Sequence, residues 1–143
     1  MKRGLIVPAH VLEAIRSHGR ADYPEECCGI LIGESLAEQD RVAEARPVPN
    51  VREEERRRRF LISPTDYFRA DRDARERGLS LLGFYHSHPD RPARPSEFDR
   101  EQAWPNLHYI VMAVSSGEPG GVTSWILSDD RGRFEEEELL LSP

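Results

Sequence analysis

Two histidines one residue apart, His86 and His88, are followed at short spacing by Ser96 and Asp99. Side chains at positions i and i+2 of a strand project from the same face, so both imidazoles can point to one side while Ser87 points away. Asp99 can add a carboxylate if the intervening proline-rich loop turns back. Two imidazoles and one carboxylate, with a fourth position left to water, are typical of a catalytic zinc site rather than of a closed structural one. The motif therefore predicts about one zinc ion per chain, bound by His86, His88 and Asp99.

A plainer interpretation of these residues needs no metal. Ser96 and Asp99 have the spacing of a capping box, in which a serine begins a helix and an acidic residue three positions later bonds back to it. Two histidines at a strand end can also be an ordinary surface pair. A capping box does not explain two histidines on one face at the end of an apolar strand. The combination therefore favours a metal site.

A zinc hydrolase also needs a carboxylate outside the ligand set that can take a proton from water. Glu25 and Glu26 directly precede the apolar segment 27–33, where a carboxylate can be partly desolvated. An ordinary charged loop is the alternative interpretation of this pair. Adjacent side chains on extended backbone face opposite ways, so only one of the two glutamates can reach the metal site.

The whole pattern resembles the JAMM metalloproteases, the catalytically competent (MPN-plus) branch of the MPN domains. In that family a glutamate on an early strand precedes His-x-His, seven residues, serine, two residues and aspartate. Glu26, His86, His88, Ser96 and Asp99 fill these positions. The resemblance extends over nearly the whole chain and is greatest to the compact bacterial members.

The resemblance implies a role for each residue of the motif. His86, His88 and Asp99 would bind zinc. Glu26 would activate water, and Ser96 would help to stabilise the oxyanion of the tetrahedral intermediate. The family further implies hydrolysis of a peptide or isopeptide bond after the C-terminal Gly-Gly tail of a ubiquitin-like or sulfur-carrier protein. A non-catalytic MPN-type scaffold is the alternative, although such scaffolds typically lack one or more motif positions.

Composition limits the location and the partners of the protein. A chain of 143 residues with 38% hydrophobic content predicts one domain, 1–143. No apolar run approaches the ~20 residues of a membrane span, and the N-terminal segment becomes polar too early for a secretory signal. A disulfide between the adjacent Cys27 and Cys28 would be strained, so we expect a cytoplasmic protein. The net charge of -6 argues against a nucleic-acid partner.

Periodicity and turn residues predict the elements that position the motif. Helices are expected over 8–19, 63–78 and 96–104, the last two with Ser63 and Ser96 as N-caps. Strands are expected over 27–33, 40–48, 58–62, 79–88, 107–114 and 121–127, with a final edge strand after a turn within 131–141. Interspersed helices and strands predict an α/β or α+β fold, and the family resemblance implies a mixed, curved sheet flanked by helices.

Three further features have open interpretations. The run 52–59, REEERRRR, is either a solvated loop or a set of arginines that binds an acidic or carboxylate-bearing partner. Cys28 is either a small buried hydrophobe or, if it lies near the metal, an extra ligand or redox switch. His108 has no partner at ligand spacing and is expected to be a surface or packing residue.

Overall fold

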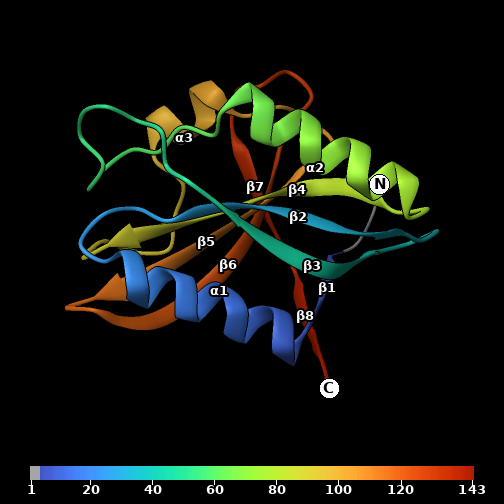
Figure 1. Ribbon diagram of the computed structural model, residues 1–143, viewed down its shortest axis with the longest axis horizontal. Coiled ribbons are helices and arrows are strands. Elements are labelled where there is room, and N and C mark those ends of the chain that lie inside the picture. Colours follow the sequence, from blue (N-terminus) through green and yellow to red (C-terminus); the bar gives the residue numbers. More distant parts are fainter. Residues whose placement is uncertain (1–3) are drawn as a thin grey trace.

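The computed structural model describes residues 4–143, in which eight strands form one sheet in the order β7-β6-β5-β4-β2-β3-β1-β8. The strands are β1 Leu5–Pro8, β2 Cys28–Ser35, β3 Asp40–Val48, β4 Ser80–Pro89, β5 His108–Ser115, β6 Glu118–Leu127, β7 Phe134–Glu137 and β8 Leu139–Ser142. The helices are α1 Ala9–Asp22, α2 Pro64–Glu76 and α3 Glu97–Gln102. Figure 1 shows α1 on one face of the sheet and α2 and α3 on the other.

The sheet is mixed and strongly curved. β4–β5, β1–β3 and β1–β8 are parallel pairs, whereas β2 pairs antiparallel with both β3 and β4. The edge strands β7 and β8 lie at opposite ends of the strand order, yet Glu138 alone separates them along the chain. The sheet must therefore curl until its two edges approach each other. The predicted α+β class, with a curved mixed sheet flanked by helices, is confirmed.

Helices cover both faces of the central strand β2. Leu31 and neighbouring core residues pack with Val11 and Ile15 of α1, while Ile30 and Ile32 lie in a second apolar cluster with α2. Because both faces are covered, β2 is buried from Cys28 through Gly33 and is a continuous apolar run rather than an alternating one. The strand that leads from Glu26 is therefore held in the middle of the molecule. None of the helices within residues 4–143 has the length and apolar character needed to cross a membrane.

The prediction of a strand over residues 58–62 is wrong. This segment has no regular secondary structure, and Asn50 holds it instead. The Asn50 Oδ1 accepts the Leu61 N–H at 3.0 Å, and the Leu61 carbonyl accepts the Val51 N–H at 2.9 Å. Phe60 therefore does not belong to a strand. Its ring stacks on the ring of His86, with 4.6 Å between the ring centroids.

The ends of two other predicted elements also differ. Gly19 does not end the first helix, which continues to Asp22. A Cβ on Gly19 would lie 2.3 Å from Cε of Met112 on β5, so the glycine allows close packing of helix on sheet. The strand β1, which the sequence pattern does not predict, comes directly before α1 and pairs in parallel with β8. The single edge strand predicted within 131–141 is two strands, β7 and β8, one at each edge of the sheet.

His108 is a buried residue at the start of β5, level with Gly83 of β4, and it bridges two carboxylates. Its Nδ1 lies 2.6 Å from Glu137 Oε2 and its Nε2 lies 2.7 Å from Asp40 Oδ2. The Ser124 hydroxyl donates to the same Glu137 oxygen at 2.7 Å. These contacts join β5 to β3 and to β7, strands that are not neighbours of one another in the sheet. His108 is thus a packing residue that ties the curled sheet together.

The stability contribution of His108 is expected to depend on pH. Burial alone would lower the pKa of His108, but hydrogen bonds to Glu137 and Asp40 raise it above the value of a free histidine. Its contribution is therefore complete below about pH 6.5 and is lost as the pH rises through the folded pKa. His108→Gln should lower the free energy of unfolding by roughly 3–5 kcal/mol at pH 6, because it removes one partner of a buried ionic network.

Urea unfolding at several pH values tests this expectation. The stability difference between wild type and His108→Gln should shrink as the pH rises above about 6.5. The exposed His10, changed to Gln, serves as the matched control and should leave the free energy of unfolding close to that of wild type. A difference that stays constant over this range would show that His108 is neutral in the folded protein.

Candidate metal centre

The strand β4 ends by presenting two imidazoles on one face. The Nε2 atoms of His86 and His88 lie 3.2 Å apart, and both side chains are buried. Ser87 points the other way, as predicted, and its Oγ accepts the Cys27 N–H at 2.8 Å. The same-face geometry expected of His-x-His on a strand is therefore present.

The third side chain comes from α3, and its cap directs it. The Asp99 N–H donates to Ser96 Oγ at 3.0 Å, and the Ser96 N–H donates to Asp99 Oδ2 at 2.8 Å. That Oδ2 atom also lies 3.1 Å from the Nε2 of His86 and 3.1 Å from the Nε2 of His88. The metal-site and capping-box interpretations of the motif are thus compatible, because the capping box itself holds the Asp99 carboxylate against the two imidazoles.

The three atoms suit a small cation. Tetrahedral zinc with bonds of ~2.0–2.1 Å separates its ligand atoms by about 3.3 Å, close to the three observed distances. The Pro92 carbonyl lies 3.0 Å from His88 Nδ1, so a proton held there leaves the Nε2 lone pair facing the centre. Asp99 Oδ1 is buried without a hydrogen-bond partner within residues 4–143. In the described part of the chain, His86, His88 and Asp99 are the one group with metal-ligand geometry.

The charge states of two of these residues also suit a cation. Burial alone would raise the pKa of Asp99, but His86 and further hydrogen bonds hold it well below its usual range. Burial lowers the pKa of His88, which favours the neutral imidazole that binds metals. The site thus offers an ionised carboxylate and a neutral imidazole.

Glu26 lies beside this centre because of the strand register. Cys28 on β2 pairs with His86 on antiparallel β4, so continuing the register by two residues brings Glu26 level with His88. Glu26 is 1% exposed, whereas Glu25 is exposed. Burial, with a smaller contribution from the charge of Asp99, raises the pKa of Glu26 to about 7 despite the opposing effects of His86 and Arg91. Of the two candidate glutamates, the structure brings Glu26 to the site.

Several residues that support the site were not identified from the sequence. Arg91 forms an ion pair with Glu26 Oε2. Asn50 Nδ2 donates to the Glu26 carbonyl at 3.2 Å, and the Glu26 N–H donates to the carbonyl of Arg56 at 2.7 Å. No spacing rule in the sequence points to these contacts, because they join segments distant along the chain. The loop between β3 and α2 therefore fixes the backbone of Glu26.

Two arginines of the charged run 52–59 pack against α3. The guanidinium groups of Arg52 and Arg59 lie 5.3 Å and 4.4 Å from the ring centroid of Phe98. Arg59 also pairs with Glu55 at 3.1 Å, while Arg56, Arg57 and Arg58 are exposed. The run is therefore more than a solvated loop, and whether it contacts a partner stays a prediction.

The position of Cys28 is explained by its packing in the apolar core. It is fully buried in the apolar cluster that includes Ile30 and Val48. Burial raises its thiol pKa, and burial likewise raises the pKa of Cys27 to about 12. Thiols that resist ionisation are poor nucleophiles and poor metal ligands. The interpretation of Cys28 as a small buried hydrophobe fits these surroundings.

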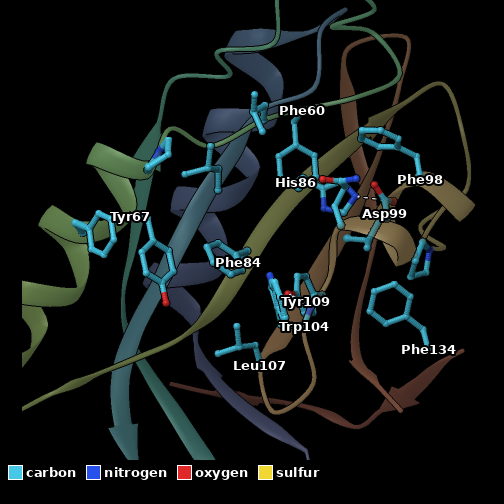
Figure 2. Close-up of a pocket in the computed structure, with 17 residues that line it drawn as sticks. Phe60, Tyr67, Phe84, His86, Phe98, Asp99, Trp104, Leu107, Tyr109 and Phe134 are labelled. Atoms are coloured by element: carbon cyan, nitrogen blue, oxygen red, sulfur yellow. Dashed lines mark hydrogen bonds and ion pairs between the residues drawn. The ribbon is translucent and has the colours of Figure 1, made fainter. Parts of the chain in front are cut away.

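An apolar groove of about 740 Å³ reaches the candidate metal centre, where His86 and Asp99 line it. Figure 2 shows Phe60 and Phe98 next to His86 and Asp99, with Tyr109 and Trp104 in the direction of Leu107. Its aromatic lining comes from Phe60, Tyr67, Phe68, Phe84, Phe98, Trp104, Tyr109 and Phe134. Phe68 and Trp104 remain 67% and 63% exposed, an unusual position for large apolar side chains. The groove is therefore a candidate binding surface for an apolar segment.

A family model described as prokaryotic homologs of the JAB domain matches residues 8–128. The chain belongs to this family. The match confirms the resemblance to compact prokaryotic JAMM proteins. This JAB-domain protein is 37% identical over 114 residues to a desampylase of Haloferax volcanii, an alignment that covers 76% of this chain and 80% of the relative.

Two other relatives of this JAB-domain protein have named activities. A probable TtuB-protein conjugate cleaving protease of Thermus thermophilus is 33% identical over 87% of this chain and 77% of its own. A CysO-cysteine peptidase of Mycobacterium tuberculosis is 29% identical over 93% of this chain and 88% of its own. The named relatives are thus peptidases or proteins that cleave conjugates.

Solved structures have the same fold as this JAB-domain protein. A Desulfitobacterium hafniense protein superposes with a TM-score of 0.85 at 29% identity, over 96% of this chain and 92% of that one. A JAB1/MPN domain protein from Archaeoglobus fulgidus superposes with a TM-score of 0.59 at 19% identity, over the full length of both chains. At that identity the second likeness concerns the fold alone.

Proposed function

We propose that this JAB-domain protein is a zinc-dependent metallopeptidase that cleaves after the C-terminal Gly-Gly tail of a ubiquitin-like or sulfur-carrier protein. The bond is a peptide or an isopeptide bond. The observation that carries the proposal is the convergence of His86, His88 and Asp99 beside the buried carboxylate of Glu26. The names of the relatives, a desampylase, a conjugate-cleaving protease and a CysO-cysteine peptidase, support this class of substrate.

His86 and His88, through their Nε2 atoms, and Asp99, through Oδ2, are the proposed zinc ligands. A bound zinc ion would polarise the scissile carbonyl and lower the pKa of water at the site from ~15.7 to roughly 7. The capping box keeps Asp99 in place, and the Pro92 carbonyl orients His88. Contacts that do not depend on the ion therefore hold two of the three side chains, Asp99 and His88.

Glu26 is the proposed general base. Its Oε2 is paired with Arg91, whereas Oε1 is buried without a partner among residues 4–143. Oε1 can accept a proton from water as the water oxygen bonds to the scissile carbonyl carbon. The same carboxyl can then give that proton to the leaving nitrogen as the C–N bond breaks. A pKa of about 7 suits a group that must both take and release a proton near neutral pH.

Ser96 is the proposed donor to the oxyanion. Its Oγ accepts the Asp99 N–H, which fixes the hydroxyl at the first turn of α3 beside the centre. The hydroxyl hydrogen is then available for the negative charge that develops on the carbonyl oxygen. A donor of this kind typically contributes a few kcal/mol to transition-state stabilisation.

The two glycines of the substrate tail are expected to be essential. A segment without side chains can approach buried ligands such as His86 and Asp99 closely, which a Cβ would hinder. Replacing both glycines of a cleaved carrier by alanine should therefore lower kcat/KM by roughly 100-fold or more. The rate of product formation, followed by mass spectrometry, checks this result. An unchanged rate would rule out tail recognition at the metal centre.

Metal removal and replacement test the enzyme as a whole. Protein purified without chelator should contain about one zinc per chain, lose activity on dialysis against a chelator and regain it with zinc. A non-catalytic scaffold would bind a carrier protein but never hydrolyse it, whatever its zinc content. Zinc well below one per chain that cannot be restored would contradict the site.

Residues 1–143 are expected to act as one domain, because the strands of residues 4–143 belong to one sheet. A cytoplasmic location stays a prediction from the sequence. The protein substrate is the expected partner, and no nucleic-acid partner is expected for a chain with net charge -6.

A further inference from the structure

Arg91 covers the buried carboxylate of Glu26 from the solvent side. It lies in the loop between β4 and α3, and its Nη2 donates to Glu26 Oε2 and, at 3.3 Å, to the carbonyl of Arg58. The Arg91 side chain is 32% exposed, whereas that of Glu26 is fully buried. The partly exposed side chain of Arg91 therefore lies directly beside a carboxylate that has no exposure of its own.

These contacts leave one hydrogen-bond donor of the Arg91 side chain without an acceptor. Its Nε is buried and has no hydrogen-bond partner within residues 4–143. A buried donor without a partner is costly, and arginine presents its donors as a planar fork that fits a carboxylate. An unpaired donor beside the catalytic carboxylate points to a ligand with an acceptor group at this position.

The chemistry of hydrolysis determines which part of a substrate lies there. Glu26 gives its proton to the leaving nitrogen, so that nitrogen must come within hydrogen-bond distance of the carboxylate. Groups attached to the nitrogen then lie next to Arg91. In a free amino acid, the α-carboxylate is two bonds from this nitrogen. In a lysine isopeptide, the nitrogen carries four methylene groups before the first polar atom.

We infer that Arg91 is a specificity-determining residue that binds the α-carboxylate of a leaving amino acid. The inference rests on the proposed function and narrows it. The enzyme releases a single residue joined to a Gly-Gly tail more readily than it cleaves an isopeptide bond to a lysine side chain. Charge-assisted hydrogen bonds between a guanidinium and a carboxylate are strong enough to produce this preference. Glu26 keeps Oε1 for the reaction while Arg91 engages the substrate.

A pair of substrates that differ in one group tests the inference. A ubiquitin-like carrier protein is extended after its Gly-Gly tail by one alanine, either as the free acid or as the amide. Zinc-loaded wild-type protein should cleave the acid with a kcat/KM roughly 10- to 100-fold above that of the amide. Arg91→Gln should bring this ratio close to one, whatever its absolute rates. Arg91→Lys should retain part of the preference, because lysine keeps the charge but not the fork.

Arg94, an exposed arginine of the same loop, provides the matched control. Arg94→Gln should keep the wild-type ratio of acid to amide cleavage. Equal cleavage of acid and amide by the wild type, or an unchanged ratio in Arg91→Gln, would overturn the role of Arg91 and leave the proposed function intact. Cleavage of neither substrate by zinc-loaded protein would overturn both.

Discussion

Glu26→Gln is expected to retain zinc and the fold while lowering kcat by at least ~100-fold. The amide of glutamine has nearly the shape of the carboxyl group but cannot accept the proton of water. Glu26 is not one of the three side chains with metal-ligand geometry, so the metal content should not change. Zinc analysis, circular dichroism and the rate of carrier cleavage together check the three parts of this result.

Glu25→Gln is the control for this variant. It makes the same chemical change one residue earlier, at an exposed position. Its rate should stay close to wild type. A loss of activity in Glu25→Gln with full activity in Glu26→Gln would assign the base to Glu25. Loss of zinc in Glu26→Gln would instead make Glu26 a ligand.

His88→Ala is expected to lose both zinc and activity. Two remaining protein ligands rarely hold zinc tightly, because structural and catalytic sites use three or four. Mutation of residues that hydrogen-bond to metal ligands lowers the affinity for the metal by about 10- to 100-fold. Removal of a ligand should therefore lower the zinc affinity by more than ~100-fold. Elemental analysis after gel filtration, with titration of added zinc, gives the loss of affinity.

His10→Ala serves as the control, since His10 is an exposed histidine on α1. It should keep one zinc per chain and wild-type activity. A His88→Ala protein that binds zinc as tightly as wild type would show that the metal lies elsewhere.

Local patterns in the sequence are sufficient to predict which side chains come together at the candidate metal centre. The facing imidazoles of His86 and His88 follow from the two-residue period of a strand, and the capping box of Ser96 and Asp99 follows from their spacing. Both features depend on neighbours along the chain. The choice of Glu26 over Glu25 as the residue beside the site cannot be made from local spacing, because it depends on how β2 pairs with β4. In the sequence, only the resemblance to the JAMM family favours Glu26 over Glu25.

Contacts between distant segments explain what the sequence could not predict. The apolar residues of 58–62 have the composition of a strand, but Asn50 and the stacking of Phe60 on His86 determine the conformation of this segment. The pairing of Arg91 with Glu26 spans 65 residues and has no sequence signature. The curl of the sheet, which brings His108 to Asp40 and Glu137, likewise depends on strand order.

Product mass is the most direct test of zinc-dependent cleavage after a Gly-Gly tail. A ubiquitin-like carrier extended beyond its Gly-Gly tail is incubated with zinc-loaded protein, with chelator-treated protein and with chelator-treated protein to which zinc is restored. The expected product ends at the second glycine in the first and third samples, and the carrier should stay intact in the second. Intact carrier in all three samples, a product that ends elsewhere, or cleavage that survives the chelator would contradict zinc-dependent cleavage after the Gly-Gly tail.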